Sequence, residues 1–278
     1  MDQYKRLSFL ISRKITSSYS TSFSLATKMF DKRTAFAIYS IYGFVRIADE
    51  IVDTFHGFDK EHLLNKFESD CFEAISLGIS TNPVLNSFQS TVREFNISDD
   101  LIKSFIESMR YDLTCNNYTG GGQIESYIYG SAEVVGLMCL RVFCNGDDKM
   151  YERLKNPAMK LGSAFQKVNF LRDLQYDNQV LGRIYLADSS AEEFDEVQKR
   201  AIVIDIEKEF DEALKGIHEL PGRAKLAVFI AYSYYRILLN KISSSPVYVL
   251  KNRRLSVSDG RKIYLLAKSV IYYKLKLI

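Results

Sequence analysis

Apolar residues along this chain recur mainly at every third or fourth position, the period of a helix that buries one face. Stretches in which apolar and polar residues alternate, as in a half-buried strand, are nearly absent. No repeat or linker divides the pattern, so we expect one all-α domain spanning residues 1–278. The pattern predicts helices over residues 2–17, 31–54, 60–77, 98–115, 124–143, 158–176, 191–217, 222–242 and 258–278, with two more beginning near Pro83 and Asp147.

The segments between these helices hold residues that begin or end helices. Asp31 can cap the helix that follows it, and Gly78 can end the one that precedes it. Residues 17–22 form a polar, hydroxyl-rich link, and residues 116–123 contain three successive glycines and are expected to form a loop. Pro157 is expected to interrupt the helical region around it, because proline lacks the N–H that a helix interior needs.

Two of the predicted helices carry the same pattern of acidic residues. Asp49 and Asp53 are four residues apart in one helix, and Asp173 and Asp177 are four apart in the other. Positions i and i+4 share a helix face, so each pair places two like charges side by side and favours a cation between them. Mg²⁺ binds through carboxylates, water and substrate phosphates. Two pairs therefore predict a divalent-metal site between facing helices, although either pair alone would also suit a solvated face.

Polar and basic residues accompany both acidic pairs. Gln166 and Asn169 precede Asp173 at helical spacing and share its stripe. Arg46 and Arg172 lie next to the two acidic pairs. Each arginine could form an ordinary salt bridge within its helix or grip phosphate oxygens, and the sequence leaves both readings open. Aromatic residues nearby fit either a plain core or a deep apolar pocket.

Composition narrows the functional classes. The net charge of +3 is too small to indicate nucleic-acid binding, and the basic excess near the C-terminus could face phosphates, anionic lipid or water. The 4 cysteines form no CxxC pair and the 3 histidines have no metal-binding spacing, so we expect neither disulfides nor zinc. No leader is evident, and the longest apolar run, residues 226–235, is about half a membrane span. We therefore expect a soluble cytoplasmic protein.

Taken together, these motifs resemble the squalene/phytoene synthase family, most closely its bacterial phytoene synthases. The resemblance covers nearly the whole chain. One departure is that Leu186-Ala187-Asp188 follows residues 182–185, where the family usually has phenylalanine and proline. The matching segments are residues 20–23, 39–53, 129–136, 166–177, 182–185, 235–238 and 254–262.

The resemblance implies an isoprenoid-synthase helical bundle around a central cavity. It further implies an enzyme of carotenoid biosynthesis that depends on Mg²⁺, or alternatively Mn²⁺. Two geranylgeranyl diphosphates would condense head to head through a cyclopropyl (prephytoene) diphosphate to 15-cis-phytoene. No NADPH is expected, because the last step is loss of a proton. The prenyl diphosphates are the expected partners, with peripheral membrane contact and no nucleic acid.

The resemblance also assigns roles to residues. As catalytic residues it implies Asp49, Asp53, Asp173, Asp177, Tyr129 and Arg46. As metal ligands it implies Asp49, Asp53, Asn169, Asp173 and Asp177. As substrate-binding residues it implies Ser20, Ser22, Phe23, Tyr42, Arg46, Gln166, Asn169, Arg172, Tyr235 and Arg254.

Three alternatives remain open. A dehydrosqualene or squalene synthase would use two farnesyl diphosphates in the same kind of site, and the depth of the pocket would decide between them. Head-to-tail prenyltransferases and terpene cyclases share the helical architecture but carry different aspartate signatures. A non-catalytic scaffold would be expected to lose its metal carboxylates, whereas all four are retained.

Overall fold

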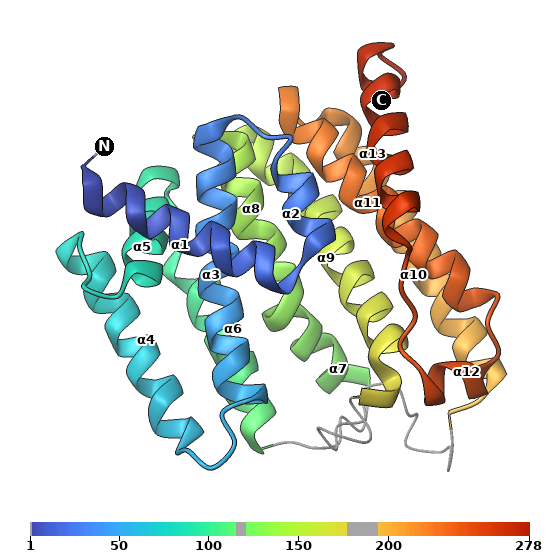
Figure 1. The fold of residues 1–278 in the computed structure, drawn as a ribbon, viewed down its shortest axis with the longest axis horizontal. Helices are drawn as coiled ribbons and strands as arrows, with labels where there is room; N and C mark the ends of the chain where they lie inside the picture. The colour runs from blue at the N-terminus through green and yellow to red at the C-terminus, as the bar shows by residue number, and fades with distance from the viewer. Residues whose placement is uncertain (1, 115–120, 177–193) are drawn as a thin grey trace.

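The computed structural model describes residues 2–114, 121–176 and 194–278, and every regular element among them is a helix (Figure 1). The all-α expectation is therefore confirmed over this part of the chain. The helices are α1 (Gln3–Tyr19), α2 (Thr21–Thr27), α3 (Lys32–Asp53), α4 (Lys60–Leu77), α5 (Pro83–Phe95), α6 (Asp99–Thr114), α7 (Gly121–Ile128), the π-helix η1 (Tyr129–Glu133), α8 (Val134–Cys144), α9 (Asp148–Tyr176), α10 (Glu196–Glu219), α11 (Gly222–Ser243), α12 (Val247–Asn252) and α13 (Asp259–Lys274).

Local signals set several helix ends where the sequence predicts them. The Asp31 carboxylate accepts hydrogen bonds from the backbone N–H groups of Arg33 and Thr34, each at 3.0 Å, and so satisfies donors that the first turn leaves free. Gly78 ends α4 in the left-handed conformation with φ of 76°, which a residue without a side chain adopts at little cost.

Three local predictions are wrong. Residues 17–22 are not a link, because only Ser20 separates α1 from α2, and the short helix α2 has too few residues to show a period. Pro157 does not interrupt α9, which continues through it while Gly216 on α10 leaves room for the proline ring. Residues 121–123 are helical rather than loop.

The core consists mainly of two clusters on either side of a cavity. On one side, Phe44 of α3 is fully buried and stacks on Phe88 of α5 with ring centroids 4.0 Å apart. On the other side, Phe210 of α10 is fully buried and meets Tyr232 of α11 edge to face at 5.4 Å. Burying large side chains in this way removes much apolar area from water. The two clusters hold α3 and α9 as rigid walls for whatever binds between them.

The continuous segment α7–η1–α8 packs closely on α9. A Cβ added at Gly162 would lie 2.8 Å from the carbonyl oxygen of Ala132, and one at Gly136 would lie 3.0 Å from that of Ala158. Residues Gly122–Cys144 are long and apolar enough to cross a membrane, with mean hydropathy 1.3, but half of that window is buried inside the protein. The glycines therefore allow the two helices to approach each other as core elements.

Candidate active site

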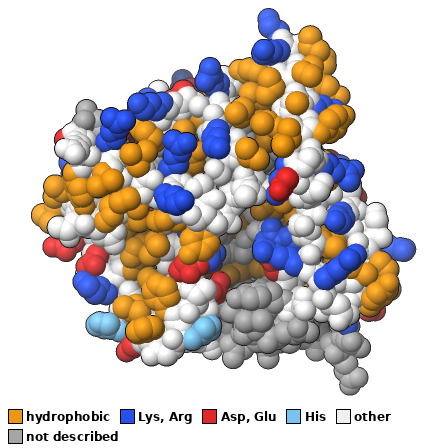
Figure 2. Space-filling view, viewed as in Figure 1, with side chains coloured by type: hydrophobic (Ala, Val, Ile, Leu, Met, Phe, Trp, Pro, Cys, Tyr) orange, Lys and Arg blue, Asp and Glu red, His pale blue; other side chains and the backbone are white. Residues whose placement is uncertain are grey.

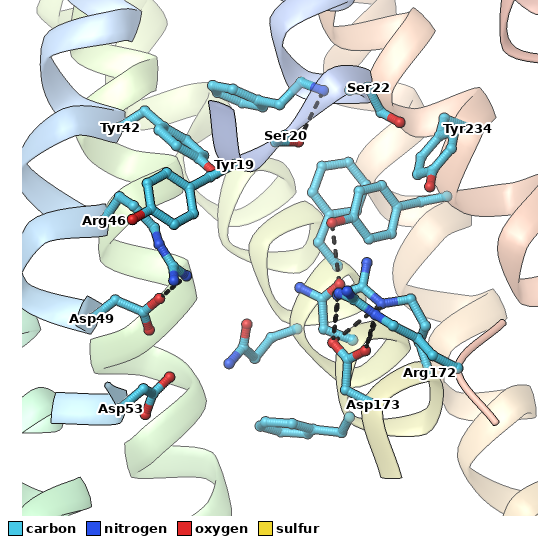
Figure 3. Close-up of a pocket in the computed structure, with 18 of the residues that line it drawn as sticks. Tyr19, Ser20, Ser22, Tyr42, Arg46, Asp49, Asp53, Arg172, Asp173 and Tyr234 are labelled. Carbon is cyan, nitrogen blue, oxygen red and sulfur yellow. Dashed lines mark hydrogen bonds and ion pairs between the residues drawn. The ribbon is translucent and has the colours of Figure 1, made fainter. Parts of the chain in front are cut away.

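A cavity of about 730 Å³ opens between α2, α3, α9 and α11. Figure 3 shows Asp49 and Asp53 on one wall and Arg172 and Asp173 across from them. The cavity thus brings together residues from opposite ends of the chain. The predicted site residues that line it are Ser20, Ser22, Phe23, Tyr42, Arg46, Asp49, Asp53, Gln166, Asn169, Arg172, Asp173, Tyr235 and Arg254.

The α3 wall presents a tyrosine, an arginine and two carboxylates at helical spacing. Arg46 donates to both Asp49 and Glu50, while its guanidinium lies over the Tyr19 ring at 4.2 Å from the centroid. Its Nε is buried with no hydrogen-bond partner among the described residues. A buried N–H without an acceptor costs free energy, so the site has an unused donor that an anionic ligand could satisfy.

Electrostatics make this wall a site for a cation. Burial and, to a lesser extent, the nearby Asp53 carboxylate together raise the pKa of Asp49 to about 7, although Arg46 opposes the shift. Two carboxylates this close resist being charged together. A divalent cation would relieve that repulsion and favour the charged form of Asp49.

The α9 wall presents a carboxylate held by two arginines. Arg172 Nε donates to Asp173 Oδ1 at 3.0 Å, and Arg254 Nε lies 2.6 Å from the same oxygen. Despite burial, which acts in the opposite direction, the bond to Asp173 raises the pKa of Arg172 above its usual value. The Arg172 guanidinium therefore stays charged beside the cavity, and both arginines could turn to phosphate oxygens.

Aromatic rings and hydroxyl groups also line the cavity. Phe165 and Tyr235 stack with centroids 3.9 Å apart, and the Tyr235 hydroxyl donates to Asn169 Oδ1 at 3.2 Å. Burial raises the pKa of Tyr42 to about 12, so this phenol stays neutral. Ser20 caps α2 through the Phe23 N–H, and Figure 3 shows Ser20 and Ser22 beside the cavity.

An apolar pocket of about 300 Å³ continues from the polar cavity, with which it shares lining residues. It runs between α3, α8 and α9 past Ile38, Val45, Cys139 and Leu161 to the stacked rings of Phe30 and Phe143, whose centroids are 5.3 Å apart. The residues shared by the two pockets are Phe23, Tyr42, Phe165, Gln166, Asn169, Ala231 and Tyr235. A polar cavity that continues into an apolar pocket fits a ligand with an anionic head and a long hydrocarbon tail.

One predicted site residue in the described part of the chain is not found on the cavity wall. Tyr129 lies on η1, is 39% exposed and lines neither pocket. Asp177 lies outside the described residues, as does the unusual segment Leu186–Asp188.

Asp112 and Tyr127 line the cavity although neither is among the predicted site residues. Tyr127 donates to Asp112 at 2.8 Å, and both line the polar cavity although Asp112 is only 6% exposed. A buried carboxylate on the polar cavity is a functional signal, but a single Asp in α6 has no partner in the sequence that would reveal it.

The donor set suits a hard divalent cation that is shared with a ligand. No group of three acidic, histidine or cysteine side chains in the described part of the chain could enclose an ion alone. Magnesium commonly takes one or two carboxylates and completes its shell with water and phosphate. Asp49 and Asp53 on one wall and Asp173 with Asn169 on the other fit that role together with a diphosphate.

Comparisons with known proteins agree with this site. Residues 16–261 match the family model described as "Squalene/phytoene synthase". The phytoene synthase of Pseudescherichia vulneris is 27% identical over 271 residues, which cover 89% of this chain and 86% of the relative. The phytoene synthase of Arthrospira platensis is 29% identical over 282 residues, with 92% and 90% covered.

A solved structure has the same fold. A dehydrosqualene synthase in complex with a ligand superimposes with a TM-score of 0.84 at 25% identity, over 98% of each chain. This similarity confirms the expected helical bundle around a central cavity.

Proposed function

This chain belongs to the squalene/phytoene synthase family and is a prenyltransferase, and we propose that it joins two geranylgeranyl diphosphates head to head to form phytoene. The observation that carries the proposal is the polar cavity, with carboxylates on two facing walls, that opens into an apolar pocket. Relatives of similar length named phytoene synthase support the choice of product.

The reaction would begin when the C1–O bond of one substrate breaks and diphosphate leaves with the bonding electrons. The double bond of the second substrate would attack the allylic cation, and loss of a proton would close a cyclopropane that still bears diphosphate. A second ionisation, rearrangement and proton loss would give the hydrocarbon. No reductant is needed, so NADPH is not required.

Asp49, Asp53, Asp173 and Asn169 would hold Mg²⁺, with Asp177 as a further proposed ligand. Bound Mg²⁺ would supply Lewis-acid neutralisation of the charge that builds on the departing diphosphate. Carboxylates on both walls allow ions to be shared between α3 and α9. The two walls would thus hold the same diphosphate from opposite sides.

The arginines would grip the diphosphate oxygens. Arg46 has a buried Nε–H with no acceptor among the described residues, and Arg172 and Arg254 both contact Asp173. Because Asp173 would also serve as a metal ligand, both guanidinium groups would be free to turn from it and donate to phosphate oxygens. The site therefore exchanges internal ion pairs for contacts with the substrate.

The aromatic residues would stabilise the reacting cations. The rings of Phe165 and Tyr235 lie where the polar cavity meets the apolar pocket, so an allylic cation formed there would face π-electrons. Apolar walls beyond them exclude water, which would otherwise capture the cation as an alcohol.

A second candidate function is dehydrosqualene or squalene synthesis from two farnesyl diphosphates. The similarity to the dehydrosqualene synthase structure favours it, because that chain aligns over 98% of its length. The two candidates differ by one isoprene unit per substrate, so the occupied length of the apolar pocket distinguishes them.

Product analysis with competing substrates tests the proposal. Purified protein, Mg²⁺ and an equimolar mixture of geranylgeranyl and farnesyl diphosphates should give mainly a C40 hydrocarbon by mass spectrometry. A C30 product would favour the second candidate instead. No coupled hydrocarbon of any length would overturn both candidates and revive the scaffold hypothesis.

A further inference from the structure

The outer face of α13 carries an exposed apolar stripe. Leu265 and Ser269 are buried against the rest of the protein, whereas Tyr264, Ile271 and Leu275 are each more than half exposed. The exposed positions follow one another by seven and four residues, so they lie along one side of the helix. Figure 1 shows the end of α13 projecting beyond the helices beside it. The helix is thus apolar on the side that packs and again on the side that faces water.

Basic residues lie beside this stripe and, at Lys268, within it, four residues after Tyr264. Arg261, Lys268, Lys274 and Lys276 are exposed, and no acidic residue occurs between Gly260 and the last residue of the sequence. Figure 2 shows hydrophobic and basic side chains mixed along the projecting helix. Nucleic acid would match the charge but not the aliphatic side chains. A surface that mixes exposed apolar and basic side chains matches the boundary of an anionic bilayer, because apolar side chains can enter it while long lysine side chains reach the lipid phosphates.

The helix also lies over one wall of the apolar pocket. Leu265 packs in a cluster with Ala26 of α2 and with Leu226 and Ile230 of α11. Ala26 lines the apolar pocket, as does Ala231 beside this cluster. Only α2 and α11 therefore separate α13 from the space where a hydrocarbon tail would lie.

We propose that the outer face of α13 docks the protein onto bilayers that contain anionic lipid. Tyr264, Ile271 and Leu275 enter the headgroup region, while the exposed lysines of the same helix extend to lipid phosphates. The consequence for turnover rests on the proposed function: a product with no polar group would leave close to lipid instead of crossing water. Docking itself depends only on the surface of α13.

Vesicle flotation of the full chain tests the proposal without substrate. We expect the protein to float with phosphatidylcholine vesicles containing about 30% phosphatidylglycerol, and much less with pure phosphatidylcholine or at about 0.5 M salt. The triple variant Tyr264→Ser/Ile271→Ser/Leu275→Ser should bind at least about tenfold more weakly, because it loses the apolar area that enters the bilayer.

A matched variant provides the control. Leu77→Ser/Ile79→Ser/Val197→Ser removes three equally exposed apolar side chains far from α13 in the sequence and should bind vesicles like the unaltered protein. Circular dichroism should show equal helix content in all three proteins. Equal flotation of the α13 variant and the unaltered protein would overturn the proposal, as would failure of the unaltered protein to float.

A second copy of the chain could cover the stripe instead of a bilayer, and light scattering tests this. If light scattering shows a dimer that the α13 variant converts to a monomer, a second copy covers the stripe and the proposal is wrong. A monomer in both cases supports it. A protein that binds vesicles but makes no hydrocarbon would contradict only the proposed function.

Discussion

Asp49 is the residue at which stability and proposed function oppose each other. Burial and the neighbouring Asp53 raise its pKa from 3.8 to about 7, so at neutral pH the folded protein holds a charge that its surroundings disfavour. Such a residue is retained where a ligand needs the charge, since an uncharged side chain would stabilise the fold.

We predict that Asp49→Asn stabilises the protein at about pH 8 and abolishes turnover. Between about pH 4 and 7 the folded state binds a proton that the unfolded state lacks, so this residue's contribution to stability falls as the pH rises. The gain at pH 8 should be roughly 1–2 kcal/mol, because the side chain is 34% exposed and water screens part of the effect. Chemical denaturation at pH 4 and 8 measures it, and the gain should vanish at the lower pH.

Activity should change in the opposite sense. Turnover of Asp49→Asn should fall about 100-fold or more, whereas Glu61→Gln, which removes an exposed carboxylate from α4, should leave it unchanged. In the unaltered protein at limiting Mg²⁺, turnover should decline below about pH 7 and recover with excess Mg²⁺, which competes with the proton. A flat pH profile at limiting Mg²⁺ would contradict this account.

The tyrosines of α7 and η1 provide a second prediction at this scale. Tyr127→Phe removes the hydroxyl that donates to buried Asp112 and should lower kcat about tenfold or more, in line with a hydrogen bond to a charged group. Tyr129→Phe should have less than about a twofold effect, because Tyr129 lines neither pocket. Steady-state kinetics of both variants measure this, and the reverse order would restore Tyr129 as the site residue.

This pair also shows what the sequence could predict about the site. The spacing of Asp49 with Asp53 and of Asn169 with Asp173 defines helix faces, and the structure places all four side chains on one cavity. Tyr127 and Tyr129 are only two residues apart, and that spacing does not show which of them faces the cavity. The π-helix adds about one residue to its turn and changes which side chains face inward, an effect that hydrophobic period does not report.

At the scale of the element, the close approach of η1 to α9 is the feature that shapes the pocket. A Cβ added at Gly162 would lie only 2.8 Å from the carbonyl oxygen of Ala132, and both residues line the apolar pocket. Because both sides of this contact are backbone or Cβ, neither can turn away. The sequence shows glycines in these helices and suggests close contact, but not which helix lies opposite.

We predict that Gly162→Ala destabilises the protein by about 1–3 kcal/mol and lowers activity as α9 moves from η1. The matched variant Gly122→Ala has no atom within 4 Å of the new Cβ and should be neutral or stabilising by up to about 1 kcal/mol. Thermal unfolding of both variants measures the difference. Equal stability of the two variants would mean that the contact between η1 and α9 adjusts to the added methyl group without cost.

The sequence patterns fail to predict α2 and the continuity of α9 for identifiable reasons. The seven residues of α2 complete only two turns, so their period cannot be separated from that of α1, and Ser20 acts as both end and cap. Pro157 is tolerated because α9 packs along α10, where Gly216 leaves space for the ring. Tertiary packing thus overrides a strong local signal.

At the scale of the whole molecule, the apolar pocket relates fold to substrate length. Cys139 on α8 borders this pocket, whose length depends on how α3, α8 and α9 are arranged. Residues from across the chain form it, so the sequence alone leaves the substrate's length open.

We predict that Cys139→Phe shifts preference from geranylgeranyl toward farnesyl diphosphate by about tenfold or more, because the ring fills space that the last isoprene unit would occupy. Cys139→Ala keeps the space open and should retain the original preference. The ratio of kcat/KM for the two substrates measures this. An unchanged ratio in Cys139→Phe would mean that the tails lie elsewhere.

The central claim is that both acidic walls act on the same diphosphates during a coupling reaction. The most direct test is the amount of inorganic diphosphate released per hydrocarbon formed from geranylgeranyl diphosphate and Mg²⁺. Because each of the two substrates loses its diphosphate, we predict two diphosphates per C40 product, with release lost in both Asp49→Asn and Asp173→Asn. Diphosphate release with only a C20 alcohol as product, or unchanged release in either variant, would contradict the account.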